Sequence, residues 1–384
     1  MGCAMPRKPS LAVAAVATAL LAAPAAAPAQ SLTGDLNRLT KSGSVAVHVA
    51  DAKTGRTLYA RRAGVQRPLA STTKLLTSLA ALQRLGGRGG TLGTTVLATG
   101  PIDAAGTLHG NVVLHGDGDP TFGTSQAFTL ADQVYAARVR RVTGAVIADE
   151  SLFDTVRGGP STGGGFDPEL GAPLSALSYD LGQTVPGGPV SGDPLPLAAA
   201  KFDDRLAAKG IVLPNRPGTT TVPIAGGTEI ARVPSPTMAE LIGTMLERSD
   251  DFFAEMLAKR VAAASGVVPA TTAAGARLIA RSGASLVDGS GLDRRDVGTV
   301  KTLTTTLRAL RKAGAESLLA RAGAGTLQGR LTGTKCRAKT GTLSGVSNLA
   351  GLCTTSRGHK VAFAVFGTTK PQVDRIARAI VKRG

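Results

Sequence analysis

Three short clusters of residues in this 384-residue chain could carry out chemistry. Ser71 and Lys74 are the ends of a Ser-x-x-Lys quartet, residues 249–251 read Ser-Asp-Asp, and Lys339 opens a Lys-Thr-Gly triplet. Residues three apart on a helix share a face, so a helix that begins at Ser71 puts its hydroxyl within reach of the Lys74 amine. A hydroxyl there is a nucleophile beside its own base, and this pair needs no histidine.

The residues around Ser71 predict that it begins a helix. Pro68 and Ala70 precede an apolar run from about 71 to 85, whose leucines recur at helical spacing, and Gly86-Gly87 ends it. The N-terminus of a helix presents free backbone N–H groups and the positive end of the helix dipole. This position favours the negative charge that develops when a nucleophile attacks a carbonyl group.

Each cluster alone is weak evidence, because Ser-x-x-Lys and Lys-Thr-Gly both occur often by chance. Their order and their contexts add weight. A serine at a helix start, a Ser-Asp-x triplet inside a helical run over about 236–264, and Lys-Thr-Gly on a strand match the three elements of penicillin-recognising serine enzymes. The one exception is Asp251.

Longer segments extend this match. The chain resembles the D-alanyl-D-alanine carboxypeptidase and endopeptidase family, the low-molecular-mass class C penicillin-binding proteins, over nearly all of its mature length. The segments that carry the resemblance are PLASTTKLLT at 68–77, GNVVLHGDGDPT at 110–121, PLSALS at 173–178, LVDGSGL at 286–292 and AKTGTLSGVSNLAG at 338–351.

The resemblance implies an α+β fold of the β-lactamase and DD-peptidase type, an antiparallel sheet between helical layers with a β-rich second domain inserted after the nucleophile helix. We expect a signal peptide at 1–29, a discontinuous serine DD-peptidase domain at 30–90 and 232–384, and an inserted domain at 91–231. The inserted segment is rich in Gly, Pro and short β-like runs, and we expect few long helices in it. A hairpin over about 44–61 and the last strands should share one sheet.

The resemblance also implies a reaction. Ser71 attacks the carbonyl of a terminal D-Ala-D-Ala peptide bond and forms an acyl-enzyme that water hydrolyses, with Lys74 as the base. Ser249 passes a proton to the leaving amine.

The same resemblance implies how the substrate is held. Lys339 and Thr340 bind its free carboxylate, and the backbone N–H groups of Ser71 and Thr342 form the oxyanion hole. β-Lactams would trap Ser71, because the opened ring cannot leave.

Asp251 departs from the family pattern, which normally has Asn at this position. An ionised Asp only accepts hydrogen bonds, whereas Asn also donates them, so a donor to the substrate backbone is lost. A carboxylate beside Lys74 also stabilises the ammonium form and opposes its use as a base. We expect a slower or more pH-dependent enzyme, unless Asp251 is protonated or held by Lys339 in the resting state.

The first thirty residues predict export. Arg7 and Lys8 precede an apolar stretch over 11–21 and a run of small residues, with cleavage expected after Ala29. No other segment is long and apolar enough to span a bilayer. We therefore expect a periplasmic or extracellular protein associated with the cell wall and without a stable membrane span.

Two cysteines remain once the leader is removed. Residues 335–342 and 347–354 predict two strands around a turn, and pairing Thr342 with Ser347 puts Cys336 opposite Cys353. A disulfide is expected in an oxidising compartment. Two buried free thiols are the alternative, because the bond geometry is strict.

The formal net charge of +18 indicates an anionic neighbourhood. The export signal, the aromatic content of 3% and the scattered Lys and Arg residues argue against nucleic acid. An anionic cell envelope and a merely solvated basic surface both remain open.

The sequence thus predicts a serine D-Ala-D-Ala carboxypeptidase that acts on peptidoglycan stem peptides, with DD-endopeptidase action left open. A β-lactamase shares the motifs, but the long insert counts against it. Asp251 makes a weakened member that only binds wall peptides a third interpretation. No cofactor is expected, and the Asp-rich run 115–119 is typical of turns rather than of a metal site.

Overall fold

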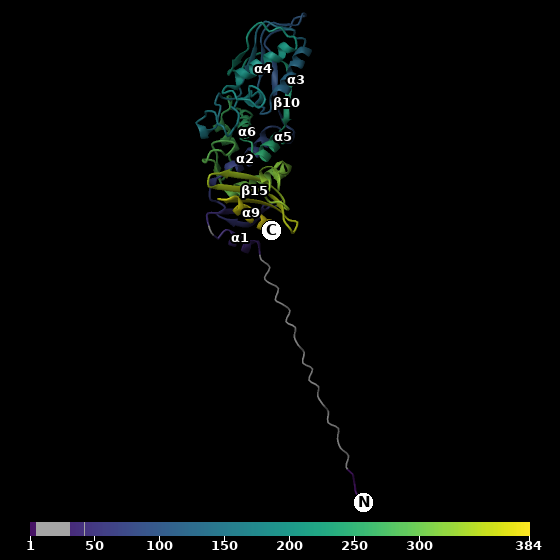
Figure 1. Ribbon diagram of the computed structural model, residues 1–384, viewed down its shortest axis with the longest axis vertical. Coiled ribbons are helices and arrows are strands. Elements are labelled where there is room, and N and C mark those ends of the chain that lie inside the picture. Colours follow the sequence, from purple (N-terminus) through teal and green to yellow (C-terminus); the bar gives the residue numbers. More distant parts are fainter. Residues whose placement is uncertain (5–30, 42) are drawn as a thin grey trace.

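The computed structural model of the protein describes residues 1–4, 31–41 and 43–384. Arg7, Lys8 and the predicted cleavage site after Ala29 lie outside the described residues. From residue 31 onward the chain forms an elongated body whose layers are stacked along its long axis (Figure 1). None of the described helices has the length and the apolar character needed to cross a membrane.

One antiparallel sheet organises the end of the body that holds the C-terminus (Figure 1). Its six strands follow the order β13-β14-β15-β16-β1-β2, so the N-terminal hairpin and the C-terminal strands share one sheet, as the sequence predicts. The strands are β1 (Ala46–Asp51), β2 (Thr57–Arg61), β13 (Ala320–Arg321), β14 (Lys335–Leu343), β15 (Val346–Thr354) and β16 (Lys360–Gly367).

Helices cover both faces of this sheet, which explains why the central strand β16 is apolar without a break over residues 361–366. Along β16, Val361 and Phe363 belong to the core that includes α1 and α9, while Ala362 and Ala364 belong to the core that includes α2 and α8. The bounds of these helices are α1 (Leu32–Leu39), α2 (Lys74–Arg84), α8 (Val300–Lys312) and α9 (Lys370–Arg383).

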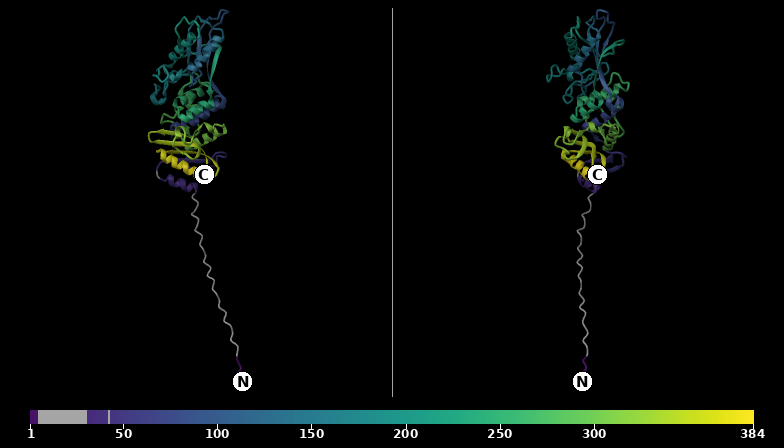
Figure 2. Two further views of the ribbon diagram at one scale, coloured as in Figure 1. Left: turned by 45° about the vertical axis from the view of Figure 1, so that its right-hand side comes forward. Right: turned by 90° about the vertical axis from the view of Figure 1, so that its right-hand side faces the viewer.

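A helical layer lies between this sheet and the far end of the body, in all three views (Figures 1 and 2). It consists of α2, α5 (Met238–Arg248), α6 (Asp251–Ala263) and α7 (Thr272–Ile279). Helix α2 contacts α5, α6, α7 and α8, and every residue from Lys74 to Leu82 is buried. The helix that follows the predicted nucleophile is therefore buried in the middle of this layer.

Two expected helix bounds need correction. The helix expected to begin at Ser71 begins at Lys74, and Ser71 lies in the preceding 3₁₀ turn η1 (Ala70–Thr73). The single helical run expected over 236–264 is interrupted at Ser249, which adopts a left-handed backbone with φ of 62° and ends α5. Asp250 then caps α6 by accepting a hydrogen bond from the Phe253 N–H.

A second sheet with its own core forms the far end of the body (Figure 2). Its order is β10-β4-β6-β8-β9, and β6, β8 and β9 run parallel. The strands are β4 (Thr91–Ala98), β6 (Val112–His115), β8 (Val146–Asp149), β9 (Gly218–Thr220) and β10 (Thr228–Thr237). Because this core is separate, we propose residues 91–231 as the inserted domain.

This segment has few long helices, as expected, but the two that it has were not located from the sequence. Helices α3 (Thr124–Ala136) and α4 (Pro194–Ala208) have 13 and 15 residues and pack against the second sheet. Helix α4 even has a start signal, because Asp193 accepts a hydrogen bond from the Leu195 N–H and Pro194 occupies the first turn. The Gly and Pro residues around it made the segment look like a loop, so the helix was not predicted.

The hairpin of β14 and β15 has the predicted register. Thr342 pairs with Ser347 and Cys336 with Cys353, and the two cysteines form a disulfide with a Cα–Cα distance of 4.2 Å. The bond joins the strand that carries Lys-Thr-Gly to its neighbour in the middle of the sheet.

We predict that reduction of this disulfide lowers the free energy of unfolding by about 3 kcal/mol, because the bond closes a loop with a sequence separation of 17. Thermal unfolding of the mature chain with and without a reductant measures the change. The double variant Cys336→Ser, Cys353→Ser should unfold at the same temperature in both conditions. An equal melting temperature for the oxidised and reduced protein would contradict the prediction.

Candidate active site

The turn that carries Ser71 is strained and is held from outside. Ala70 adopts a φ of 48°, in the left-handed region that costs a residue with a side chain roughly 1–2 kcal/mol. Asn348 on β15 donates from Nδ2 to the carbonyl oxygens of Pro68 and Leu69, at 2.9 and 3.0 Å. Hydrogen bonds from the sheet thus offset strain next to the nucleophile.

Two glycines allow the close approach of neighbouring segments to this turn. A Cβ on Gly341, the last residue of Lys-Thr-Gly, would lie 2.8 Å from the Leu69 carbonyl oxygen. A Cβ on Gly291 would lie 2.1 Å from the Ala70 carbonyl oxygen. The glycine of the triplet therefore has a packing role: it lets β14 pass directly beside Ser71.

Lys74 is fully buried one helical turn from Ser71. Its Nζ donates to Asp251 Oδ1 at 2.5 Å and to the Ser290 carbonyl oxygen at 2.8 Å, rather than to the Ser71 hydroxyl. Asp251 is thus bound by Lys74, and the alternative that Lys339 holds it is wrong. A buried ammonium needs such partners, because removing its water is costly.

Lys339 is also fully buried and reaches the corner between α5 and α6. Its Nζ donates to Ser249 Oγ at 2.8 Å and to the Thr340 carbonyl oxygen at 2.9 Å. Burial, and secondarily the charge of Lys74, hold the pKa of Lys339 well below its usual value, while Asp251 acts in the opposite direction. The left-handed backbone of Ser249 places its hydroxyl where Lys339 can donate to it.

The carboxyl group of Asp251 is influenced by both lysines. Burial raises the pKa of its carboxyl, although Lys74 and, less strongly, Lys339 act to lower it. Its side chain retains 16% exposure. Asp251 therefore contacts both the buried lysine and the open site.

A pocket of about 380 Å³ opens above the two lysines. The predicted residues that line it are Ser71, Ser249, Asp251, Thr340 and Thr342. The structure thus brings all seven predicted residues together, five at the wall and Lys74 and Lys339 beneath it. The arrangement offers a nucleophile, buried amines and hydroxyls within one small volume.

Three further residues line the pocket and were not predicted: Thr326, Arg330 and Lys370. Arg330 binds Asp374 of α9 through two nitrogens, at 2.8 and 3.0 Å. These residues belong to no chemical motif, and no signal in the sequence places them near Ser71. The packing of α9 on the sheet brings Lys370 there, and the 3₁₀ turn η6 (Gly325–Leu327), which contacts α5 and β14, brings Thr326.

Buried carboxyl groups hold the turn at 288–293, which contacts Lys74. Asp288 accepts hydrogen bonds from the N–H groups of Ser290, Gly291 and Asp293, so it organises the turn whose carbonyl holds Lys74. Glu255 accepts from Ser290 N–H at 2.8 Å, and burial, with the charge of Asp288, raises its pKa to about 8. Asp288 thus has the structural role that turn residues of this kind usually have.

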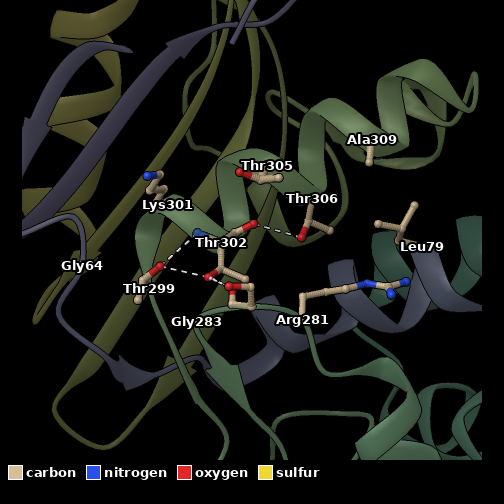
Figure 3. Close-up of a pocket in the computed structure, with 11 residues that line it drawn as sticks. Gly64, Leu79, Arg281, Gly283, Thr299, Lys301, Thr302, Thr305, Thr306 and Ala309 are labelled. Carbon is tan, nitrogen blue, oxygen red and sulfur yellow. Dashed lines mark hydrogen bonds between the residues drawn. The ribbon is translucent and has the colours of Figure 1, made fainter. Parts of the chain in front are cut away.

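A larger pocket of about 550 Å³ lies elsewhere, between α2 and α8 (Figure 3). Its threonine hydroxyls bond within the protein: Thr302 Oγ1 donates to the Ser282 carbonyl oxygen and Thr306 Oγ1 to the Thr302 carbonyl oxygen, each at 2.9 Å (Figure 3). It contains none of the predicted site residues, so size does not mark the active site here.

The fold is that of a known penicillin binding protein and a known peptidoglycan endopeptidase. Penicillin binding protein 4 (dacB) from Haemophilus influenzae superimposes with a TM-score of 0.74 at 22% identity, over 90% of this chain and 97% of that one. Bd3459, a predatory peptidoglycan endopeptidase from Bdellovibrio bacteriovorus, gives 0.58 at 17% identity, over 88% and 93%. The chain has the α+β fold of the DD-peptidases, as the sequence predicts.

Sequence comparison identifies the family. Residues 29–187 and 182–383 match the D-Ala-D-Ala carboxypeptidase 3 (S13) family. Carboxypeptidase DacB of Mycolicibacterium smegmatis is 32% identical over 87% of this chain and 78% of its own length. Carboxypeptidase Rv3627c of Mycobacterium tuberculosis is 32% identical over 84% and 76%. The chain belongs to the S13 family and is a serine-type D-Ala-D-Ala carboxypeptidase.

We predict that the buried carboxyl of Glu255 makes stability fall with pH. Between about 4.5 and about 8 the folded chain keeps a proton that the unfolded chain releases, so the free energy of unfolding decreases as pH rises, by up to about 1.4 kcal/mol per pH unit. Glu255→Gln should flatten this slope in denaturant titrations across that range. The exposed Glu247→Gln is the control, and an unchanged slope for Glu255→Gln would refute the assignment.

Proposed function

We propose that the enzyme removes the terminal D-Ala from peptidoglycan stem peptides through an acyl-enzyme on Ser71. The observation that supports this assignment best is that Ser71, Ser249, Thr340 and Thr342 line one pocket directly above two buried lysines. Family membership supplies the reaction, and the pocket supplies residues that suit each of its steps.

In the first step Ser71 Oγ bonds to the carbonyl carbon of the penultimate D-Ala and its proton passes to Lys74. Lys74 must be a free amine to accept this proton, and in the resting site its Nζ is bonded to the Asp251 carboxylate. The backbone N–H groups of Ser71 and Thr342 would stabilise the oxyanion, and the tight packing at Gly341 supports this role.

In the second step the C–N bond breaks and the leaving amine takes a proton from Ser249. The proton that Lys74 accepted replaces the one that Ser249 gives up, and Lys339 donates a hydrogen bond to Ser249 Oγ that keeps this hydroxyl in place. The hydroxyls of Thr340 and Thr342 would bind the substrate carboxylate, with Lys339 beneath them. Water then hydrolyses the ester and frees Ser71 for another turnover.

The place of action follows from the leader and the disulfide. An export signal at 1–29 and the Cys336–Cys353 bond both suit a compartment outside the cytoplasm, where peptidoglycan is found. Penicillin binding protein 4 of H. influenzae is known in complex with a β-lactam. We propose that β-lactams acylate Ser71 of this chain, and that the basic chain lies in an anionic envelope.

We predict that a fluorescent penicillin labels the mature chain stably and that the chain releases D-Ala from a peptide ending in D-Ala-D-Ala. Ser71→Ala should abolish both, whereas Ser344→Ala, at an exposed serine of the β14–β15 turn, should leave both intact. Rapid hydrolysis of the drug without D-Ala release would support the β-lactamase alternative instead. Neither labelling nor release would point to a binding protein without turnover.

We predict that Asp251→Asn speeds acylation near neutral pH by about tenfold, because it removes the carboxylate that stabilises the Lys74 ammonium. Burial raises the pKa of Asp251, so below that pKa the carboxyl is neutral and the advantage of the variant should shrink. The rate of penicillin labelling from about pH 5 to 9 measures both effects.

Asp250→Asn is the matched control for this experiment, because it makes the same change one residue earlier and Asn also caps helices well. If Asp251→Asn and the natural chain acylate at equal rates across the whole range, Asp251 does not control Lys74.

A further inference from the structure

Lys370, the first residue of α9, lines the catalytic pocket and belongs to none of the three motifs. We propose that Lys370 binds the free carboxylate of the substrate's terminal residue and so favours removal of a C-terminal residue over cleavage within a peptide. This inference rests on the proposed role of Ser71 and adds a specificity residue to that site.

The other cations of the site are already matched. Lys74 bonds to Asp251 and a carbonyl oxygen, and Lys339 bonds to a hydroxyl and a carbonyl oxygen, with both amines fully buried. Arg330 is paired with Asp374. Among residues 31–41 and 43–384, Lys370 has no carboxylate within ion-pair distance, and its side chain is exposed. Of these four residues, Lys370 alone is both exposed and unpaired with a carboxylate, so it can meet a substrate's negative charge from the open side of the pocket.

The backbone beneath Lys370 is fixed. Pro371 follows it in the first turn of α9, and Thr369 caps the helix by accepting a hydrogen bond from the Gln372 N–H. Gly367, at the end of β16, packs so closely that a Cβ would lie 2.7 Å from Val373. The position of the Lys370 backbone at the pocket is thus set by the sheet.

The signs of the charges around the pocket orient a substrate. Asp251 brings a carboxylate from α6, and Lys370 brings an ammonium from α9. A substrate whose acyl chain lies at Ser71 has its terminal carboxylate repelled by Asp251 and attracted by Lys370. Thr340 and Thr342 line the same pocket and offer hydroxyl groups to the carboxylate. A substrate without this charge gains nothing from Lys370.

The test compares two peptides that differ only at the terminus, one ending in D-Ala-D-Ala and one ending in D-Ala-D-Ala amide. Lys370→Gln should lower kcat/KM for the acid about three- to fivefold, through KM, and leave the amide unchanged. Lys370→Arg should restore most of the loss, and added salt should affect Lys370→Gln less than the natural chain. Lys382→Gln, at an exposed lysine of the last turn of α9, is the control.

Binding separates this inference from the proposed function. In a Ser71→Ala background, which cannot form the acyl-enzyme, calorimetry should show that Lys370→Gln weakens binding of the acid by a similar factor and does not change binding of the amide. Equal effects on both peptides, or no effect on either, would overturn the role of Lys370. If the natural chain releases no D-Ala but this difference in binding persists, the proposed catalysis fails and the carboxylate site stands.

Discussion

The close contact between two backbones, the strand β14 and the turn before α2, is the constraint on which the site depends. Gly341 lacks a side chain where any Cβ would meet the Leu69 carbonyl oxygen, and Asn348 bonds the same turn from the next strand. This contact puts a serine on a strained turn beside a strand that carries Lys339. The Lys-Thr-Gly triplet thus acts as one unit: Gly341 lets the strand approach the Ser71 turn, and Lys339 lies on the same strand at this contact.

Burial of two ammonium groups side by side imposes the second requirement. Charged groups taken out of water destabilise the fold unless they are paired and hydrogen-bonded. Lys74 meets this condition through Asp251 and the Ser290 carbonyl, and Lys339 meets it through Ser249. The three motifs therefore also stabilise one another. The same bonds keep the two amines in the core and fix their positions.

The parts that could be predicted from the sequence are those set by local rules. The position of the turn at 343–346 set the register of the hairpin, so pairing Thr342 with Ser347 placed Cys336 opposite Cys353. The break at Ser249 was missed because a left-handed serine has no distinctive neighbour in the sequence. Lys370 and the pairing of Arg330 with Asp374 depend on how α9 packs, and packing between distant elements leaves no local pattern.

Helix α6 joins the active site to the inserted segment and explains why two separate cores form one protein. Asp251, in its first turn, bonds Lys74. Two turns later Lys259, fully buried, binds Asp154 at 2.5 Å, and Arg260 binds Asp117 at 2.9 Å. Both acids belong to the segment 91–231, so one helix forms ion pairs with Lys74 beneath the pocket and with two acids of the inserted segment. A displacement of the insert would move α6, and with it the carboxylate that is bonded to Lys74.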